Sequence, residues 1–229
     1  MIFEPSTSPV GLLLSGGLDS SILLGTLLDE GCRVQPFYVR SQLIWEPAEL
    51  RAVRRLLGAL ASPLVEELVL LELPLADLYG DHWSVTGREP PDASTDDEAV
   101  YLPGRNALLT IKAALWCQLH GLERLALGVL ESNPFGDATP AFFDAFESAM
   151  NCTSGARLRL VRPFAGLDKR QVMQLGRDLP LELTFSCIAP SAGLHCGRCN
   201  KCAERNAAFG LIGAEDPTEY AVPLTSRSR

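Results

Sequence analysis

The stretch "LLLSGGLDSS", residues 12–21, decides the fold of this 229-residue chain. The apolar run Val10–Leu14 leads directly into a glycine pair, and an apolar helical pattern, Ser20–Leu28, follows at once. Glycines let the backbone turn sharply at the end of a strand, and they leave the N–H groups at the start of a helix accessible to an anion. We interpret the segment as a strand, an anion-binding loop and a helix.

The rest of the chain alternates between apolar strand candidates and helical patterns. Further strands are predicted at Val34–Val39, Val65–Leu71, Leu125–Leu130 and Arg157–Val161, and further helices at Pro47–Leu60, Arg105–His120, Pro140–Met150 and Lys169–Leu179. Continuously apolar strands separated by helices are typical of a parallel sheet that is buried on both faces. The predicted fold class is therefore α/β, with a doubly wound, mainly parallel sheet. The acidic, proline-rich segment 86–99 is predicted to be a mobile loop, either a lid or an insertion.

The residues of the glycine loop separate it from two common phosphate-binding motifs. The loop lacks the lysine and the spacing of G-x-x-x-x-G-K-[ST], and it lacks G-x-G-x-x-G as well. Positive charge for a phosphate ligand must therefore come from elsewhere, most simply from Mg²⁺ and a distant Lys or Arg, and Asp19 is a candidate to help hold the metal. The alternative interpretation is a tight turn in which Ser and Asp side chains cap the helix.

The overall composition limits the class of protein and of partner. Hydrophobic residues make up 47% and charged residues 21%, which is an ordinary globular balance. The formal net charge of −8 argues against an extended basic surface, so we expect no direct nucleic-acid partner. The opening "MIFEPSTSPV" has no secretory pattern, and the apolar stretch 68–79 is too short and too acidic to span a bilayer. We expect a cytoplasmic protein with no membrane association, whose thiols stay reduced.

Four cysteines cluster near the C-terminus, where "HCGRCNKC" covers 195–202 and Cys187 precedes it. The spacing C-x8-C-x2-C-x2-C offers four thiolates to one ion and predicts a structural zinc site formed by Cys187, Cys196, Cys199 and Cys202. An iron–sulfur cluster, C-x-x-C redox chemistry and chance clustering are the alternatives. His195 is a further candidate ligand in place of one cysteine. The remaining cysteines, Cys32, Cys117 and Cys152, are predicted to be small core residues.

The septet Ser15–Ser21 resembles the PP-loop of the N-type ATP pyrophosphatase superfamily, whose members adenylate a substrate. Four more stretches widen the resemblance: "YLPGRNALLTIKAA" at 101–114, "LALGVLESN" at 125–133, "RPFAGLDKRQVMQLG" at 162–176 and "LELTFSC…CGRCNKCAERNAAF" at 181–209. Together they make the chain similar to the 7-cyano-7-deazaguanine synthase family of queuosine biosynthesis. The resemblance covers most of the chain. It divides the sequence into a PP-loop ATP-binding domain, 1–182, and a C-terminal zinc-binding segment with a tail, 183–229.

The resemblance implies that ATP adenylates 7-carboxy-7-deazaguanine, that ammonia converts the adenylate to an amide, and that a second activation gives the nitrile preQ0. The implied cofactors are structural Zn²⁺ and Mg²⁺ with ATP, and homodimers are common in the family. Lys169, Arg105 and Asp19 match residues placed to contact phosphate or to act in catalysis. The implied ATP-binding residues are Leu14, Ser15, Gly16, Gly17, Leu18, Asp19, Ser20, Ser21, Ile22, Leu23 and Leu24.

The chain departs from the family on the substrate side. It has "LESNPFGDATPAFFDAF" where the family carries a Tyr-Pro-Asp-Cys-Arg run, so Phe135 and Asp137 are the substrate candidates there, with Asn106 beside them. Arg40 in "PFYVRSQLIW" is the candidate for a family arginine. The departures leave open a related PP-loop ligase that adenylates a different carboxylate or uses a different deazapurine acceptor. A tRNA-modifying PP-loop enzyme and a non-catalytic nucleotide- or zinc-binding module are two further possibilities.

Overall fold

The computed structural model describes residues 8–154 and 157–224, and its centre is a five-stranded parallel sheet. The strand order is β3-β2-β1-β4-β5, and all four neighbouring pairs run parallel. The strands are β1 (Val10–Leu13), β2 (Val34–Arg40), β3 (Val69–Glu72), β4 (Arg124–Ala126) and β5 (Arg159–Val161). The predicted doubly wound α/β fold is confirmed. The ends of the chain, 1–7 and 225–229, lie outside the described residues.

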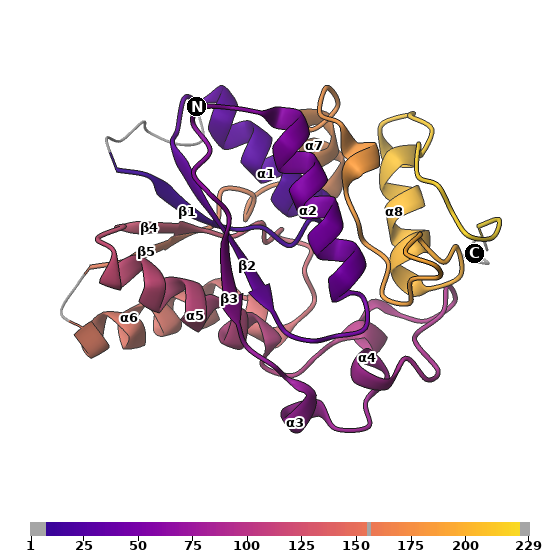
Figure 1. The fold of residues 1–229 in the computed structure, drawn as a ribbon, viewed down its shortest axis with the longest axis horizontal. Helices are drawn as coiled ribbons and strands as arrows, with labels where there is room; N and C mark the ends of the chain where they lie inside the picture. The colour runs from indigo at the N-terminus through magenta and orange to yellow at the C-terminus, as the bar shows by residue number, and fades with distance from the viewer. Residues whose placement is uncertain (1–7, 155–156, 225–229) are drawn as a thin grey trace.

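The helices cover both faces of this sheet (Figure 1). Helices α1, α2 and α7 lie on one face, while α5 and α6 lie on the other. The helices are α1 (Leu18–Asp29), α2 (Glu46–Leu60), α3 (Ala76–Tyr79), α4 (Trp83–Thr86), α5 (Arg105–Leu119), α6 (Pro140–Ser154), α7 (Lys169–Leu175) and α8 (Asn200–Leu211). Short 3-10 turns, η1 (Asp97–Val100), η2 (Gly136–Ala138) and η3 (Leu181–Leu183), complete the element order.

Several predicted elements differ from the observed ones at their ends. The predicted strand Leu125–Leu130 is wrong beyond Ala126, because the chain leaves the sheet there and passes over the start of α1. The strand predicted at Val65–Leu71 begins only at Val69, and Val65 forms an isolated bridge with Val34. The helix predicted to Leu179 ends at Leu175. Helix α8 was not predicted from the sequence at all.

Two hydrophobic clusters fill the space between the sheet and its helices. On the α1 side, Leu12, Ile22 and Leu24 are fully buried together with residues of α2 and α7. On the opposite side, Phe37 and Cys117 are buried between β2 and α5. Because the strands are covered on both faces, their apolar runs are continuous, as the sequence indicates.

A third hydrophobic cluster joins the C-terminal segment to α2 and to the chain around 100–102. It includes Trp45, Leu102, Phe185 and Cys187. Segment 86–99, predicted to be a mobile loop, is hydrogen-bonded to the cysteine-rich segment: Ala93 N–H donates to Arg198 O at 2.8 Å, and Asn200 N–H to Pro91 O at 3.0 Å. The division of the chain at residue 182 remains a prediction. Ala208 and Phe209 of α8 pack into the hydrophobic cluster on the α1 side of the sheet.

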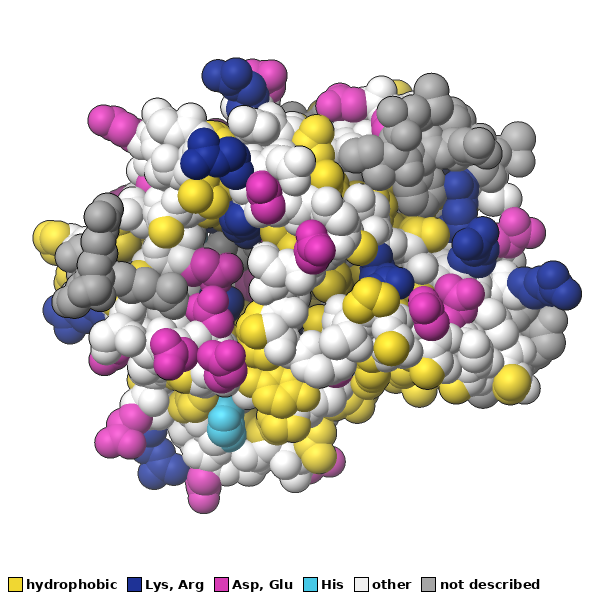
Figure 2. Space-filling view, turned by 180° about the vertical axis from the view of Figure 1, so that it is seen from behind, with side chains coloured by type: hydrophobic (Ala, Val, Ile, Leu, Met, Phe, Trp, Pro, Cys, Tyr) yellow, Lys and Arg dark blue, Asp and Glu magenta, His cyan; other side chains and the backbone are white. Residues whose placement is uncertain are grey.

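The surface carries charges of both signs. On the face drawn in Figure 2, Lys and Arg side chains are interspersed with Asp and Glu and with apolar side chains. Within the described ranges, no helix combines the length and the apolar character that crossing a membrane requires.

Candidate active site and metal centre

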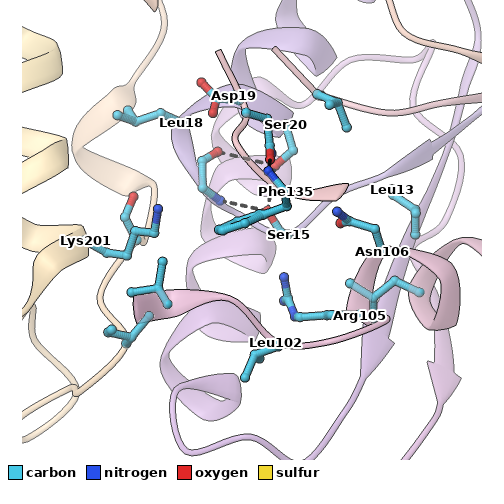
Figure 3. A pocket seen from close by; sticks show the side chains of 18 of the residues that line it. Leu13, Ser15, Leu18, Asp19, Ser20, Leu102, Arg105, Asn106, Phe135 and Lys201 are labelled. Carbon is cyan, nitrogen blue, oxygen red and sulfur yellow. Dashed lines mark hydrogen bonds between the residues drawn. The ribbon is translucent and has the colours of Figure 1, made fainter. Parts of the chain in front are cut away.

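The glycine loop connects β1 to α1 at the carboxyl end of the sheet. Gly16 has a φ of +80°, and a Cβ there would lie 2.9 Å from Val53 Cγ2, so this turn against α2 requires glycine. Gly17 is the N-cap residue of α1 and has no side chain to cap the helix, while Ser15 Oγ accepts from Gly17 N–H at 3.4 Å in the turn before it. Ser15 Oγ and Ser20 Oγ lie 3.1 Å apart at the mouth of the loop (Figure 3). The helix start is therefore accessible to an anion.

The loop lies where the winding of the sheet reverses. Strand β1 has β2 on one side and β4 on the other. The chain passes from β2 to α2 on one face of the sheet, and from β4 to α6 on the other face. Open parallel sheets bind ligands in the crevice at such a point. Gly128, just beyond β4, also lines this crevice. Its backbone lies so close to the start of α1 that a Cβ there would be 3.1 Å from Ser20 N.

A cavity of about 340 Å³ opens at this point, a size that suits a small-molecule ligand. Five of the predicted ATP-binding residues line it: Ser15, Gly17, Leu18, Asp19 and Ser20. The others support the loop from inside, since the structure buries Leu14, Ser21, Ile22, Leu23 and Leu24. Their assignment to ATP remains a prediction.

Lys169 lies at the start of α7 and faces the glycine loop. Its Nζ donates to Asp19 Oδ1 at 2.6 Å, across 150 residues of sequence. Asp168 caps this helix start in a capping box with Gln171. The distant cation that the loop sequence requires is thus placed beside the loop.

The start of α5 forms another wall of the cavity, on the opposite side from Lys201 (Figure 3). Asn106 donates through its backbone N–H and its Nδ2 to the two carboxylate oxygens of Asp137, both at 3.1 Å. Arg105 lines the same wall, and its Nε is buried without a hydrogen-bond partner in the part of the chain that the structure describes. Phe135 stacks on Tyr101 with ring centroids 4.9 Å apart. The structure therefore brings Arg105, Asn106, Phe135 and Asp137 together.

Arg40 is directed elsewhere. Its guanidinium pairs with Glu46 at 2.9 Å and with Glu72 at 2.8 Å, and Arg40 is not among the described residues that line the cavity. Its predicted role toward the substrate has no support in this arrangement.

Sequence reasoning missed several residues of the cavity. They come from three places: the start of α2, the chain around α4 and η1, and helix α8. They are Trp45, Glu49, Trp83, Tyr101, Leu102, Lys201, Glu204 and Arg205. Lys201 and Arg205 lie in the cysteine-rich stretch 181–209, but only the packing of α8 places them beside the cavity.

The four clustered cysteines form a compact group of sulfur atoms. All four Sγ atoms lie within 4.8 Å of one another, with Cys187–Cys199 at 3.8 Å and Cys196–Cys202 at 3.9 Å. A tetrahedral zinc ion with Zn–S bonds of about 2.3 Å places its sulfurs about 3.8 Å apart. The cluster is therefore compatible with a bound metal ion. Gly197, at a φ of +78°, supplies the turn between two of the cysteines.

His195 is not part of the sulfur group. Its Nε2 accepts a hydrogen bond from Ser186 N–H at 3.1 Å, and its ring lies 4.4 Å from that of Phe185. Burial lowers the pKa of His195 to about 3, so the ring is neutral and able to accept that bond. Of the cysteines outside the cluster, Cys32 and Cys117 are buried as predicted, whereas Cys152 is exposed and the core prediction for it is wrong.

The fold and the site together define the class: an α/β protein with a PP-loop-like glycine loop and a C-terminal cluster of four cysteines that is compatible with a metal ion. The chain belongs to the family of queuosine biosynthesis proteins QueC, whose sequence model matches residues 10–213. The family resemblance predicted from the sequence is confirmed. Membership makes the chain an enzyme of the synthase type.

Individual relatives agree with this family. The 7-cyano-7-deazaguanine synthase of Methanopyrus kandleri is 36% identical over 91% of this chain and 97% of its own length. The synthase of the same name from Anaeromyxobacter dehalogenans is 32% identical over 92% of this chain and 94% of its own length.

Among solved structures, a predicted tRNA methyltransferase subunit from Methanocaldococcus jannaschii matches 75% of each chain with a TM-score of 0.49 at 14% identity.

Proposed function

We propose that the protein is an ATP-dependent carbon–nitrogen ligase that converts 7-carboxy-7-deazaguanine and ammonia into 7-cyano-7-deazaguanine. The name of the relatives supports the product. The observation that carries the proposal is the cavity itself, where an uncapped helix start and Lys169 face a wall built from Arg105, Asn106 and Phe135. One end suits a polyphosphate and the other suits a flat, polar heterocycle.

The chemistry explains why ATP is needed. A carboxylate is a poor electrophile, so one of its oxygens attacks the α-phosphorus of ATP and pyrophosphate leaves. In the acyl adenylate, the C–O bond to AMP is easily broken, and ammonia replaces AMP to give the amide. A second adenylation, on the amide oxygen, allows that C–O bond to break while nitrogen loses its two protons, which leaves the nitrile.

The residues around the loop serve the phosphate end of this reaction. N–H groups at the start of α1 and the hydroxyls of Ser15 and Ser20 donate to phosphate oxygens, and Lys169 adds a full positive charge. Asp19, in the first turn of α1 and held by Lys169, is the carboxylate that would contact the Mg²⁺ that accompanies ATP, and that ion would neutralise phosphate charge.

The heterocycle end is formed by Phe135, whose ring gives a stacking surface, and by Asp137 and Asn106, whose polar atoms face the edge of the base. The four clustered cysteines would hold Zn²⁺, whose contribution is to the folding of the C-terminal segment. All four sulfurs would be used as ligands, so no coordination position remains for a substrate.

The test is to incubate the purified protein with ATP and 7-carboxy-7-deazaguanine, with and without ammonium, and to measure AMP and the nitrile. Formation of both, dependent on ammonium, is the expected result. AMP release with other carboxylates but not with this one would favour the related ligase instead, and stimulation by tRNA alone would favour a tRNA-modifying enzyme.

A further inference from the structure

Four carboxylates line the cavity, and three of them contact a cation or an amide of the protein. Asp19 is paired with Lys169, Asp137 accepts from Asn106 with both oxygens, and Glu204 is paired with Lys201. The fourth is Glu49, in the first turn of α2. No cation of the described residues forms an ion pair with it.

One oxygen of Glu49 is held in place and the other is open. Tyr38 Oη donates to Glu49 Oε2 at 2.6 Å, and Tyr38 is itself buried in β2. Among the described residues Tyr38 is the hydrogen-bond partner of this carboxylate, so Oε1 remains available to a ligand in the cavity. The backbone of Glu49 also lies close to the glycine loop: a Cβ at Gly16, if there were one, would be 3.3 Å from the carbonyl oxygen of Glu49.

The pKa of Glu49 depends on its burial and on the charged and polar groups around it. Burial raises the pKa of Glu49 to about 7, an effect that Glu46 on the same helix increases and that Arg105 on α5 and the Tyr38 hydroxyl of β2 oppose. Glu46 itself is occupied by Arg40. A carboxyl group with such a pKa is able to exchange a proton with a ligand near neutral pH.

We propose that Glu49 binds the ammonium ion that supplies nitrogen to the reaction and accepts one of its protons. The inference rests on the proposed function, in which ammonia is the nucleophile. An alkylammonium ion such as that of lysine keeps its proton at neutral pH, and ammonium does likewise, so free ammonia must be generated where it is used. The aromatic residues Trp45, Trp83 and Tyr101 line the same cavity, and aromatic rings attract small cations.

The step balances without a further reactant. Ammonium gives a proton to Glu49, and the released ammonia forms a C–N bond with the acyl carbon. The C–O bond to AMP breaks, and AMP leaves with the electron pair. The new amide nitrogen loses its surplus proton to water, and Glu49 returns its proton to the solvent.

The experiment compares the wild type with Glu49→Gln, using Glu67→Gln on the exposed surface as the matched control. ATP–pyrophosphate exchange in the presence of 7-carboxy-7-deazaguanine and without ammonium reports adenylation alone. We expect Glu49→Gln to retain this exchange within about threefold but to lose ammonium-dependent turnover by about 100-fold. Hydroxylamine, which is largely uncharged at neutral pH, should still trap the adenylate as a hydroxamate at nearly the wild-type rate.

A second variant tests the proton itself. Tyr38→Phe keeps the carboxylate but removes a hydrogen bond that lowers the pKa of Glu49. The pH at which ammonium-dependent turnover reaches half its maximum should therefore move upward, while the profile with hydroxylamine should not. An unshifted ammonium profile would contradict the role of Glu49 as proton acceptor.

The possible failures are distinguishable. If the wild type shows no exchange with the deazapurine carboxylate, the proposed function fails and the ammonium site falls with it. If exchange is present and Glu49→Gln keeps its ammonium-dependent turnover, the ammonium site alone is wrong. Loss of exchange and of ammonium-dependent turnover to the same extent would assign Glu49 to the binding of substrate or to the support of the loop, and would also overturn the inference.

Discussion

Removal of the Asp216 carboxylate should destabilise the protein strongly, because it leaves a buried cation without its counter-charge. The Arg205 side chain is fully buried, and the Asp216 side chain is only 3% exposed. Arg205 Nε lies 3.7 Å from Asp216 Oδ1. Arg205 also donates to Thr184 Oγ1 at 2.7 Å and to Leu181 O at 2.8 Å, which are neutral acceptors.

The magnitude follows from this geometry. Breaking a buried ion pair by removing one partner costs about 3–5 kcal/mol. The remaining neutral acceptors of Arg205 solvate part of the charge, so Asp216→Ala is expected at the lower end, near about 3 kcal/mol. For a chain of this size, each kcal/mol lowers Tm by about 2–4 °C, so Tm should fall by about 6–12 °C.

Thermal and urea unfolding monitored by circular dichroism, with the metal content of each sample measured, test this expectation. Asp216→Asn is the matched variant, because it keeps the shape and an acceptor for Thr218 N–H while it removes the charge. The double variant Arg205→Met with Asp216→Leu should be less destabilised than the sum of its single changes by at least about 1 kcal/mol. Additive single changes, or a loss below about 1 kcal/mol for Asp216→Ala, would refute the reasoning.

Three further predictions concern the site. Lys169→Met should lower AMP formation by about 100-fold or more, since it removes the charge beside the loop, whereas Lys169→Arg should keep part of the activity; an unchanged rate in the Met variant would exclude contact with phosphate. Gly128→Ala places a methyl group 3.1 Å from Ser20 N and should lower turnover about tenfold, while Gly210→Ala, with open space around it, should have no effect on the rate. Cys199→Ala should lower metal content and solubility together, and full metal occupancy measured in that variant would contradict the four-cysteine site.

The fold was predictable because its signals are local. The strand, glycine pair and helix at 10–29 follow one another without interruption, and each parallel strand contains a short apolar run. The spacing of the four cysteines likewise predicted that their sulfur atoms converge, since thiols two residues apart can face one point without help from the rest of the fold.

The remainder of the site depends on contacts that no local pattern contains. Helix α8 has a polar sequence, and its buried Arg205 is paired with Asp216 and donates to Leu181 O of η3, two partners that lie outside the helix. Glu49 is one of several charged residues in an amphipathic helix, and nothing in its neighbourhood along the chain separates it from Glu46. Only the packing of α2 against the glycine loop turns Glu49 toward the cavity and Glu46 toward Arg40.

The cysteine-rich segment and the glycine loop are joined by a hydrogen bond, and this connects the four-cysteine cluster to the cavity. Phe185 N–H donates to Gly16 O at 2.7 Å, so the segment that enters the cluster at Cys187 also holds the left-handed turn of the loop. His195 reinforces the connection, because its neutral ring accepts from Ser186 N–H and packs on Phe185. A metal ion that orders residues 187–202 therefore restrains the loop through only two intervening peptide units.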